Sequence, residues 1–135
     1  MLKLIIGVKG TGKTKALINL VNTAVDNSHG DVVCIEKGAK LRYDVKYQAR
    51  LIDTNEYFVT DAETLYGFVA GILASNHDVT DLFIDSALKI CNNDVAAFEK
   101  FIDAVDALSQ KLNVKVVMTS SVPVENATDT MKKYI

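Results

Sequence analysis

Eight residues near the beginning of the chain carry the clearest chemical signal in the sequence. They are Gly7-Val8-Lys9-Gly10-Thr11-Gly12-Lys13-Thr14, which fit the pattern G-x-x-x-x-G-K-[ST] of a phosphate-binding loop, the Walker A motif. Glycines in such a loop let backbone N–H groups turn toward an anion, and the dipole of the following helix favours negative charge there. The pattern predicts phosphate contacts from Gly7, Lys9, Gly10, Thr11, Gly12, Lys13, Thr14 and Lys15.

Three side chains have more specific predicted roles in binding a nucleotide with its magnesium ion. Lys13 is expected to reach the β- and γ-phosphates, and the Thr14 hydroxyl is expected to bind Mg²⁺. A second Mg²⁺ contact is expected from Asp85, which follows the apolar run Leu82-Phe83-Ile84 as in a Walker B motif. An aspartate after an apolar run can also be a simple helix cap, so this assignment depends on the preceding Walker A loop.

The elements that must position these residues alternate between strands and helices. Apolar runs predict strands at 2–6, 31–36, 80–85 and 114–118, and amphipathic spacing predicts helices at 15–26, 60–75, 95–112 and 125–135. Gly30 is expected to close the first helix in the left-handed conformation, and Thr60 and Glu63 are expected to form a capping box.

Residues 37–60 give the least regular pattern. The runs 41–45 and 49–53 are compatible with a short hairpin or with one long loop, and residues 57–59 are expected to form another short strand. The sequence leaves the hairpin and the loop as open alternatives.

Alternating strands and helices of these lengths predict an α/β fold of three layers. Its mainly parallel sheet is expected to have four to five strands, with helices on both faces. Short loops at the carboxyl edge of such a sheet would bring Gly10, Lys13, Glu36, Asp85 and Thr119 toward one crevice.

Length and composition limit the function classes. The 135 residues, 49% of them hydrophobic, predict one domain over 1–135 with a sizeable core. The formal net charge of −2 and the lack of a basic run argue against nucleic acid as a partner, and Lys37, Lys40 and Arg42 are interpreted as a solvated loop.

The remaining composition favours a cytoplasmic protein. Cys34 and Cys91 lie in apolar sequence without C-x-x-C spacing, which indicates buried thiols in a reducing compartment. No apolar run has the length of a membrane span, and the first residues do not form a signal peptide. His29 and His77 are expected to face solvent.

These motifs together resemble the P-loop NTPases, and their arrangement is similar to the RecA-like ATPases of that superfamily. The chain also resembles a small group of Firmicute ATP-binding proteins. The resemblance implies that the strand after the Walker B strand lies beside the phosphate-loop strand. It also implies that Thr119, or Ser120, at the tip of that strand senses the γ-phosphate.

The same resemblance implies a catalytic role for Glu36. Many related ATPases carry a glutamate directly after the Walker B aspartate, where this chain has Ser86, and RecA-like enzymes often place it at the end of the second strand, where Glu36 stands. Glu36 would then orient or deprotonate water, while Lys13, Mg²⁺ and Thr119 stabilise charge on the γ-phosphate. A solvated glutamate at a strand end is the alternative.

Arg42 and Arg50 flank the irregular segment, and either could act as an arginine finger on the γ-phosphate. Ordinary surface arginines are the alternative.

Three functions are compatible with these motifs. The first is a slow, magnesium-dependent ATPase that switches a loop or a partner surface, acting through a protein partner or as a homo-oligomer. The second is a nucleotide-binding module that does not hydrolyse, and the third is a small-molecule kinase. ATP is favoured over GTP because no N-K-x-D sequence follows the Walker B run.

Overall fold

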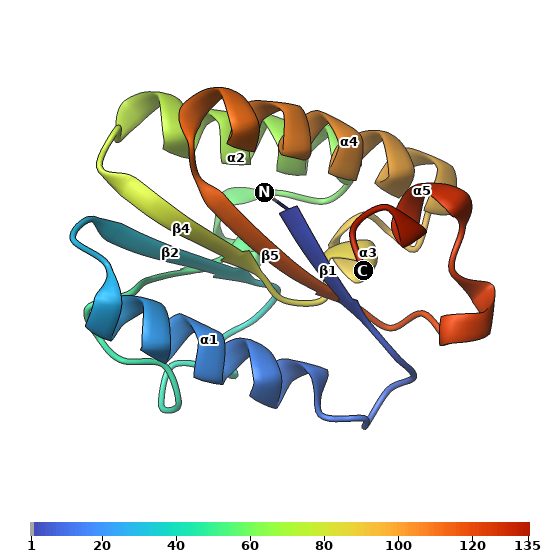
Figure 1. The fold of residues 1–135 in the computed structure, drawn as a ribbon, viewed down its shortest axis with the longest axis horizontal. Helices are drawn as coiled ribbons and strands as arrows, with labels where there is room; N and C mark the ends of the chain where they lie inside the picture. The colour runs from blue at the N-terminus through green and yellow to red at the C-terminus, as the bar shows by residue number, and fades with distance from the viewer. Residues whose placement is uncertain (1) are drawn as a thin grey trace.

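A twisted parallel sheet forms the middle of the molecule in the computed structural model, which describes residues 2–135. Its five strands lie in the order β1-β5-β4-β2-β3, and every neighbouring pair is parallel. The carboxyl ends of all the strands therefore lie along one edge, toward the right in Figure 1. The strands are β1 (Leu2–Ile6), β2 (Asp31–Glu36), β3 (Arg50–Asp53), β4 (Val79–Ile84) and β5 (Lys115–Ser120).

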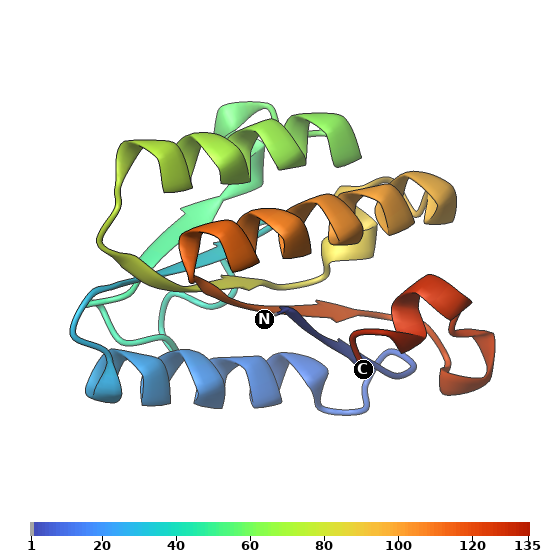
Figure 2. The same cartoon turned by 45° about the horizontal axis from the view of Figure 1, so that its top comes forward.

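Helices cover both faces of the sheet, as the three layers in Figure 2 show. Helix α1 (Lys13–Asn27) lies alone on one face, while α2 (Ala62–Ser75) and α4 (Val95–Leu112) lie together on the other. Two shorter helices, α3 (Ala87–Ile90) and α5 (Asp129–Lys132), complete the α/β fold. The predicted three-layer class is thereby confirmed, with a wholly parallel sheet of five strands.

The sheet has two apolar cores because side chains alternate between its faces. In β4, Leu82 and Ile84 point to the α2 and α4 side, whereas Phe83 packs with Leu17 and Val21 of α1. Each fully buried side chain of this size stabilises the fold by about 1.5–3 kcal/mol. The predicted burial of Cys34 and Cys91 is confirmed, and neither forms a disulfide.

The segment after β2 does not form the hairpin that the sequence left open as one of two alternatives. Residues 37–49 contain no strand and run over the α1 face, where Leu41, Val45 and Ala49 are buried beside α1. Their spacing of four residues lets irregular backbone insert three apolar side chains into one core. The chain then enters β3, which pairs in parallel with β2 as an edge strand, so the hairpin alternative is wrong.

The strand expected at 57–59 is also absent. Residues Thr54–Tyr57 form a short 3-10 helix, and Phe58 follows with a left-handed φ of 57°. The Asp53 side chain accepts a hydrogen bond from the Asn55 N–H and so caps the start of this helical turn. Such a local hydrogen bond from side chain to backbone competes with extended strand structure.

Two predicted helix ends are wrong in detail. The capping box of α2 is formed by Asp61 and Thr64, whose side chains each accept a hydrogen bond from the other's backbone N–H. Gly30 does not have a left-handed φ, and α1 ends instead at Ser28 in extended conformation. Glycine is needed at 30 for space, because a Cβ there would lie 2.3 Å from the carbonyl oxygen of Asp78.

Residues 125–135 are less helical than expected. A 3-10 helix at Val124–Asn126 precedes α5, which is only four residues long. The chain then returns to β1, where the Leu4 N–H donates to the carbonyl oxygen of Tyr134 at 2.8 Å. Among residues 2–135, the helices are all too short or too polar to cross a membrane.

Candidate functional site

The loop between β1 and α1 has the geometry that an anion site requires. Gly10 and Gly12 both have φ near 86°, in the left-handed region where glycine is favoured. Gly12 is also the N-cap of α1 and has no side chain that could accept from the first N–H groups of the helix, and the first turn contains no acidic residue. The first N–H groups of α1 therefore have no side-chain cap and no acidic residue in their own turn, and they can bind an external anion.

Two side chains of the loop donate to the same backbone oxygen. The Thr11 Oγ1 donates to the carbonyl oxygen of Val8 at 2.7 Å, and the Lys13 Nζ donates to it at 2.9 Å. Gly7 is required for this turn, since a Cβ there would lie 2.7 Å from Thr11 Oγ1. The Lys13 ammonium is thus held over the loop, close to the N-terminus of α1.

Asp85 follows β4 at the carboxyl edge of the sheet and accepts hydrogen bonds from two hydroxyl groups. Thr14 Oγ1 lies 3.2 and 3.3 Å from its two carboxylate oxygens, and Thr119 Oγ1 donates to Oδ1 at 2.7 Å. β5 lies between β1 and β4 in the sheet, so the tip of β5 places Thr119 beside the aspartate. The Walker A and Walker B residues therefore meet in space.

The hydroxyl proton of Thr119 is already used within this cluster. The hydroxyl donates to Asp85 and accepts from the Ser86 N–H at 2.8 Å, and Thr119 is only 1% exposed. A hydroxyl has one proton to donate. In this arrangement Thr119 therefore orients Asp85 and the backbone that follows it.

The donor set fits magnesium bound together with a phosphate group. A hydroxyl and a carboxylate are hard oxygen ligands, and Mg²⁺ is usually bound by one or two carboxylates together with substrate phosphates and water. No group of three or more His, Cys, Asp or Glu side chains within the described residues has the arrangement of a metal site. Thr14 and Asp85 would thus hold the ion together with the phosphate groups of a bound ligand.

A cavity of about 610 Å³ opens between these elements. The phosphate-binding loop and the start of α1 form one part of its wall, and residues after β2 and β4 and at the end of β5 form the remainder. The residues that line it are Lys9, Gly10, Gly12, Lys13, Thr14, Lys15, Lys40, Leu41, Asp85, Ser86, Leu88, Lys89, Asn93, Thr119 and Ser121.

Glu36 is at the same edge of the sheet but does not line this cavity. It is 3% exposed, and its two carboxylate oxygens accept the N–H groups of Lys40 at 3.0 Å and Leu41 at 3.1 Å. Burial raises the pKa of this carboxyl group, although the two backbone hydrogen bonds oppose the shift. Glu36 is therefore neither a solvated residue nor directed into the cavity.

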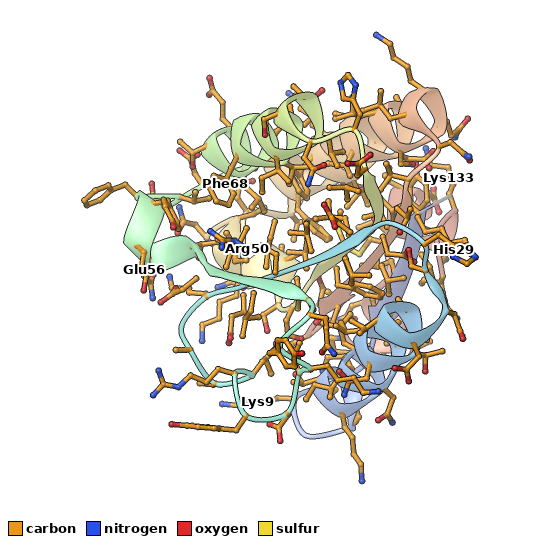
Figure 3. All side chains as sticks on the ribbon, turned by 90° about the vertical axis from the view of Figure 1, so that its left-hand side faces the viewer. Lys9, His29, Arg50, Glu56, Phe68 and Lys133 are labelled. Atoms are coloured by element: carbon orange, nitrogen blue, oxygen red, sulfur yellow. The ribbon has the colours of Figure 1, made fainter. Side chains whose placement is uncertain are left out.

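Neither arginine proposed as a finger lines the cavity. The Arg42 guanidinium lies 5.0 Å from the centre of the Tyr43 ring, on the exposed part of the segment after β2. Arg50 lines a different cavity together with Phe68. Figure 3 shows Arg50 and Phe68 well away from Lys9 of the phosphate-binding loop.

Sequence analysis missed two lysines in the cavity wall. Lys40 belongs to the group that was interpreted as a solvated loop, and Lys89 lies in α3, which the sequence did not predict. The position of Lys89, four residues after Asp85, was the available signal, because the start of a helix after the Walker B strand faces the same crevice.

Comparison with known proteins supports the fold. No protein-family model matches the chain, and no curated protein is similar to it in sequence. Among solved structures 137 chains match, including a KaiC-like protein from the hyperthermophilic archaeon Pyrococcus horikoshii. That protein is similar at a TM-score of 0.72 with 14% identity, over 98% of this chain and 66% of its own. The likeness supports a P-loop NTPase-like fold, and the chain spans about two thirds of the length of this structural relative.

Proposed function

We propose that the chain is a magnesium-dependent ATP-binding protein. One observation carries the proposal: Thr14 and Asp85 lie in hydrogen-bond contact beside the uncapped N-terminus of α1. A helix start without a side-chain cap or an acidic residue in its first turn favours phosphate, and the adjacent hydroxyl and carboxylate favour the hard cation that accompanies it. We further propose that the order of β1, β5 and β4 reflects the RecA-like arrangement of this superfamily, with the Firmicute ATP-binding proteins as relatives.

Each residue of the site has a proposed task. The backbone of Gly7–Gly12, with the side chains of Lys9, Thr11 and Lys15, would bind the phosphates, and Lys13 would contact the terminal ones. Thr14 and Asp85 would hold Mg²⁺, and Thr119 would keep Asp85 oriented. When bound, Mg²⁺ supplies positive charge that neutralises the phosphate oxygens.

We propose slow hydrolysis as the activity. The resemblance to RecA-like ATPases makes Glu36 the candidate for orienting the attacking water, which requires it to exchange its hydrogen bonds with Lys40 and Leu41 for a position in the cavity. Ser86 follows Asp85 and is no base at neutral pH, so the usual position for a catalytic carboxylate lacks one. The hydrogen bonds from Lys40 and Leu41 to Glu36 favour a second candidate, a nucleotide-binding module with no turnover. In both cases the bound nucleotide would act on a loop, a protein partner or a second copy, in the cytoplasm.

Thermal unfolding with ATP, ADP and GTP, each with and without Mg²⁺, tests the binding proposal. A ligand at a hundred times its Kd adds about 2.7 kcal/mol to stability, which raises the midpoint by several degrees in a domain of this size. We expect the largest shift with ATP and Mg²⁺ and no shift in Lys13→Ala. An equal shift in Lys13→Ala, or no shift with any nucleotide, would contradict the proposal.

Phosphate release then separates the two candidates. Release above background by the wild type, and its loss in Glu36→Gln at ATP concentrations that saturate the variant, would support the ATPase with Glu36 as catalytic residue. Binding without release would support the non-hydrolysing module.

A further inference from the structure

The cavity carries more positive charge than the phosphate-binding loop alone supplies. One carboxylate, Asp85, lines it, against five ammonium groups: Lys9, Lys13, Lys15, Lys40 and Lys89. Since the whole chain has a formal net charge of −2, this excess is local to the cavity. A concave surface lined by one sign of charge concentrates ligands of the opposite sign.

Lys40 and Lys89 come from outside the Walker A motif. Neither side chain has an ion-pair partner within residues 2–135, in contrast to Lys46, which pairs with Asp26, and Lys133, which pairs with Asp103. Both are exposed, and both border the cavity. Their charges are therefore available to an anionic ligand there.

The backbone of Lys40 is held in place by two carboxylates at the ends of β2 and β3. Glu36 accepts the N–H groups of Lys40 and Leu41, and Asp53 accepts the N–H of Gly38 at 2.8 Å. Glu36 and Asp53 are paired in the register of the two strands, so their carboxylates accept hydrogen bonds from the loop at adjacent positions. Gly38, with φ of 110°, allows the tight turn between these contacts.

The side chain of Leu41 fixes the other end of this short loop. Leu41 is 3% exposed and packs in the same core as Leu17 and Val21 of α1. The backbone of Lys40, the residue before Leu41, is thereby held at the rim of the cavity. The phosphate-binding loop leads into the same helix, α1, on which Leu41 packs.

We infer that Lys40 and Lys89 bind the terminal phosphate of the nucleotide, and that Glu36 is the positioning residue that holds Lys40 there. The inference rests on the proposed function and extends it by naming the residues that distinguish a triphosphate from a diphosphate. They supply, at the terminal phosphate, the positive charge that neither Arg42 nor Arg50 brings to the cavity. Charge-assisted hydrogen bonds to phosphate from a flexible ammonium need no fork geometry, so lysine is sufficient.

The affinities for ATP and ADP, both with Mg²⁺, test the inference in Lys40→Ala and Lys89→Ala. We expect each variant to lose about tenfold or more in affinity for ATP, while its affinity for ADP stays within about twofold of the wild type. Lys37→Ala is the matched control, because Lys37 is an exposed residue of the same loop that does not line the cavity and carries the same charge.

Glu36→Gln, alone and combined with Lys40→Ala, separates positioning from general-base catalysis. A glutamine can accept only one of the two backbone N–H bonds, so Lys40 should be released and the preference for ATP over ADP should fall. We expect the double variant to lose no more of the ATP preference than Lys40→Ala alone, because both substitutions remove the same contact between Lys40 and the phosphate. Hydrogen exchange at the amides of residues 38–41 should also become faster in Glu36→Gln.

The outcomes distinguish this inference from the function on which it rests. Equal losses for ATP and ADP in Lys40→Ala and Lys89→Ala, or the same loss in Lys37→Ala, would overturn the inference and leave the binding proposal intact. Additive effects of Glu36→Gln and Lys40→Ala on the ATP preference would overturn the role of Glu36. A wild-type protein that binds neither nucleotide would overturn both proposals.

Discussion

Asp85 and Glu36 stand at equivalent places in the fold and yet have different surroundings. Each is a buried carboxylate at the carboxyl end of a central parallel strand, and β2 and β4 are neighbours in the sheet. Asp85 accepts hydrogen bonds from the hydroxyl groups of Thr14 and Thr119 and lines the cavity. Glu36 accepts them from the backbone of Lys40 and Leu41 and does not.

The difference shows how the partner determines what a buried carboxylate can do. A hydroxyl can rotate away from its acceptor, so the hydrogen bonds to Asp85 at the end of β4 can be exchanged for contacts with a metal ion. A backbone N–H is fixed by the chain and must be satisfied when buried, so the end of β2 is a structural clamp. Four predictions test this contrast.

The largest expected effect is on nucleotide binding in Asp85→Asn. Replacing the charged ligand by an amide should weaken ATP binding about 10–100-fold with Mg²⁺ and far less without it, since the loss is that of one charged contact. Titration calorimetry with and without Mg²⁺ measures this. Glu36→Gln should retain the dependence on Mg²⁺, and an equal loss of that dependence in both variants would abolish the contrast.

The second expected effect is on stability, and here the substitution of Glu36 has the larger effect and that of Asp85 the smaller one. Glu36→Gln leaves a buried backbone N–H without an acceptor, which should lower the free energy of unfolding by about 1–3 kcal/mol. Asp85→Asn should lower it by less than about 1 kcal/mol, because the hydroxyls of Thr14 and Thr119 can rotate to accept from the new amide. Denaturant unfolding of the ligand-free proteins gives both values, and a larger loss in Asp85→Asn would contradict the clamp.

The third effect is a dependence of stability on pH that comes from Glu36. Burial raises its pKa in the folded chain above the ordinary 4.5, so the folded state binds the proton more tightly than the unfolded state. The contribution of Glu36 to stability is therefore greatest below its unfolded pKa and falls as the pH rises toward its folded pKa.

Thermal midpoints from about pH 4 to about pH 8 should show this loss in the wild type and not in Glu36→Gln. Parallel curves for the two proteins would assign the pH dependence to other groups.

The smallest effect concerns Cys34, which lies in β2 near both carboxylates. Burial raises the pKa of its thiol to about 12, with further contributions from the negative charges of Asp85 and Glu36, and burial raises that of Cys91 to about 12 as well. At about pH 8 both thiols should react with a thiol reagent only as fast as the chain unfolds. Rapid labelling of Cys34 in the folded protein would mean that the end of β2 opens locally.

Local sequence determined much of this molecule. The glycines and the lysine of Gly7–Thr14 specify the turn and the helix start by their own backbone preferences. The apolar runs specify β1, β2, β4 and β5, of which β2 and β4 are largely buried on both faces. The long amphipathic helices follow from spacing alone. These features depend on residues close together in the chain, so they could be predicted along with the three-layer class.

Tertiary structure decided what each polar residue does. Whether Glu36 meets water or backbone depends on the path of residues 37–49, which is set by Leu41, Val45 and Ala49 packing against a distant helix. The same path brings Lys40 to the cavity, while Arg50 enters an edge strand facing a different one. Such contacts join residues that are far apart in the chain, and their geometry is fixed only when the sheet order and both cores have formed.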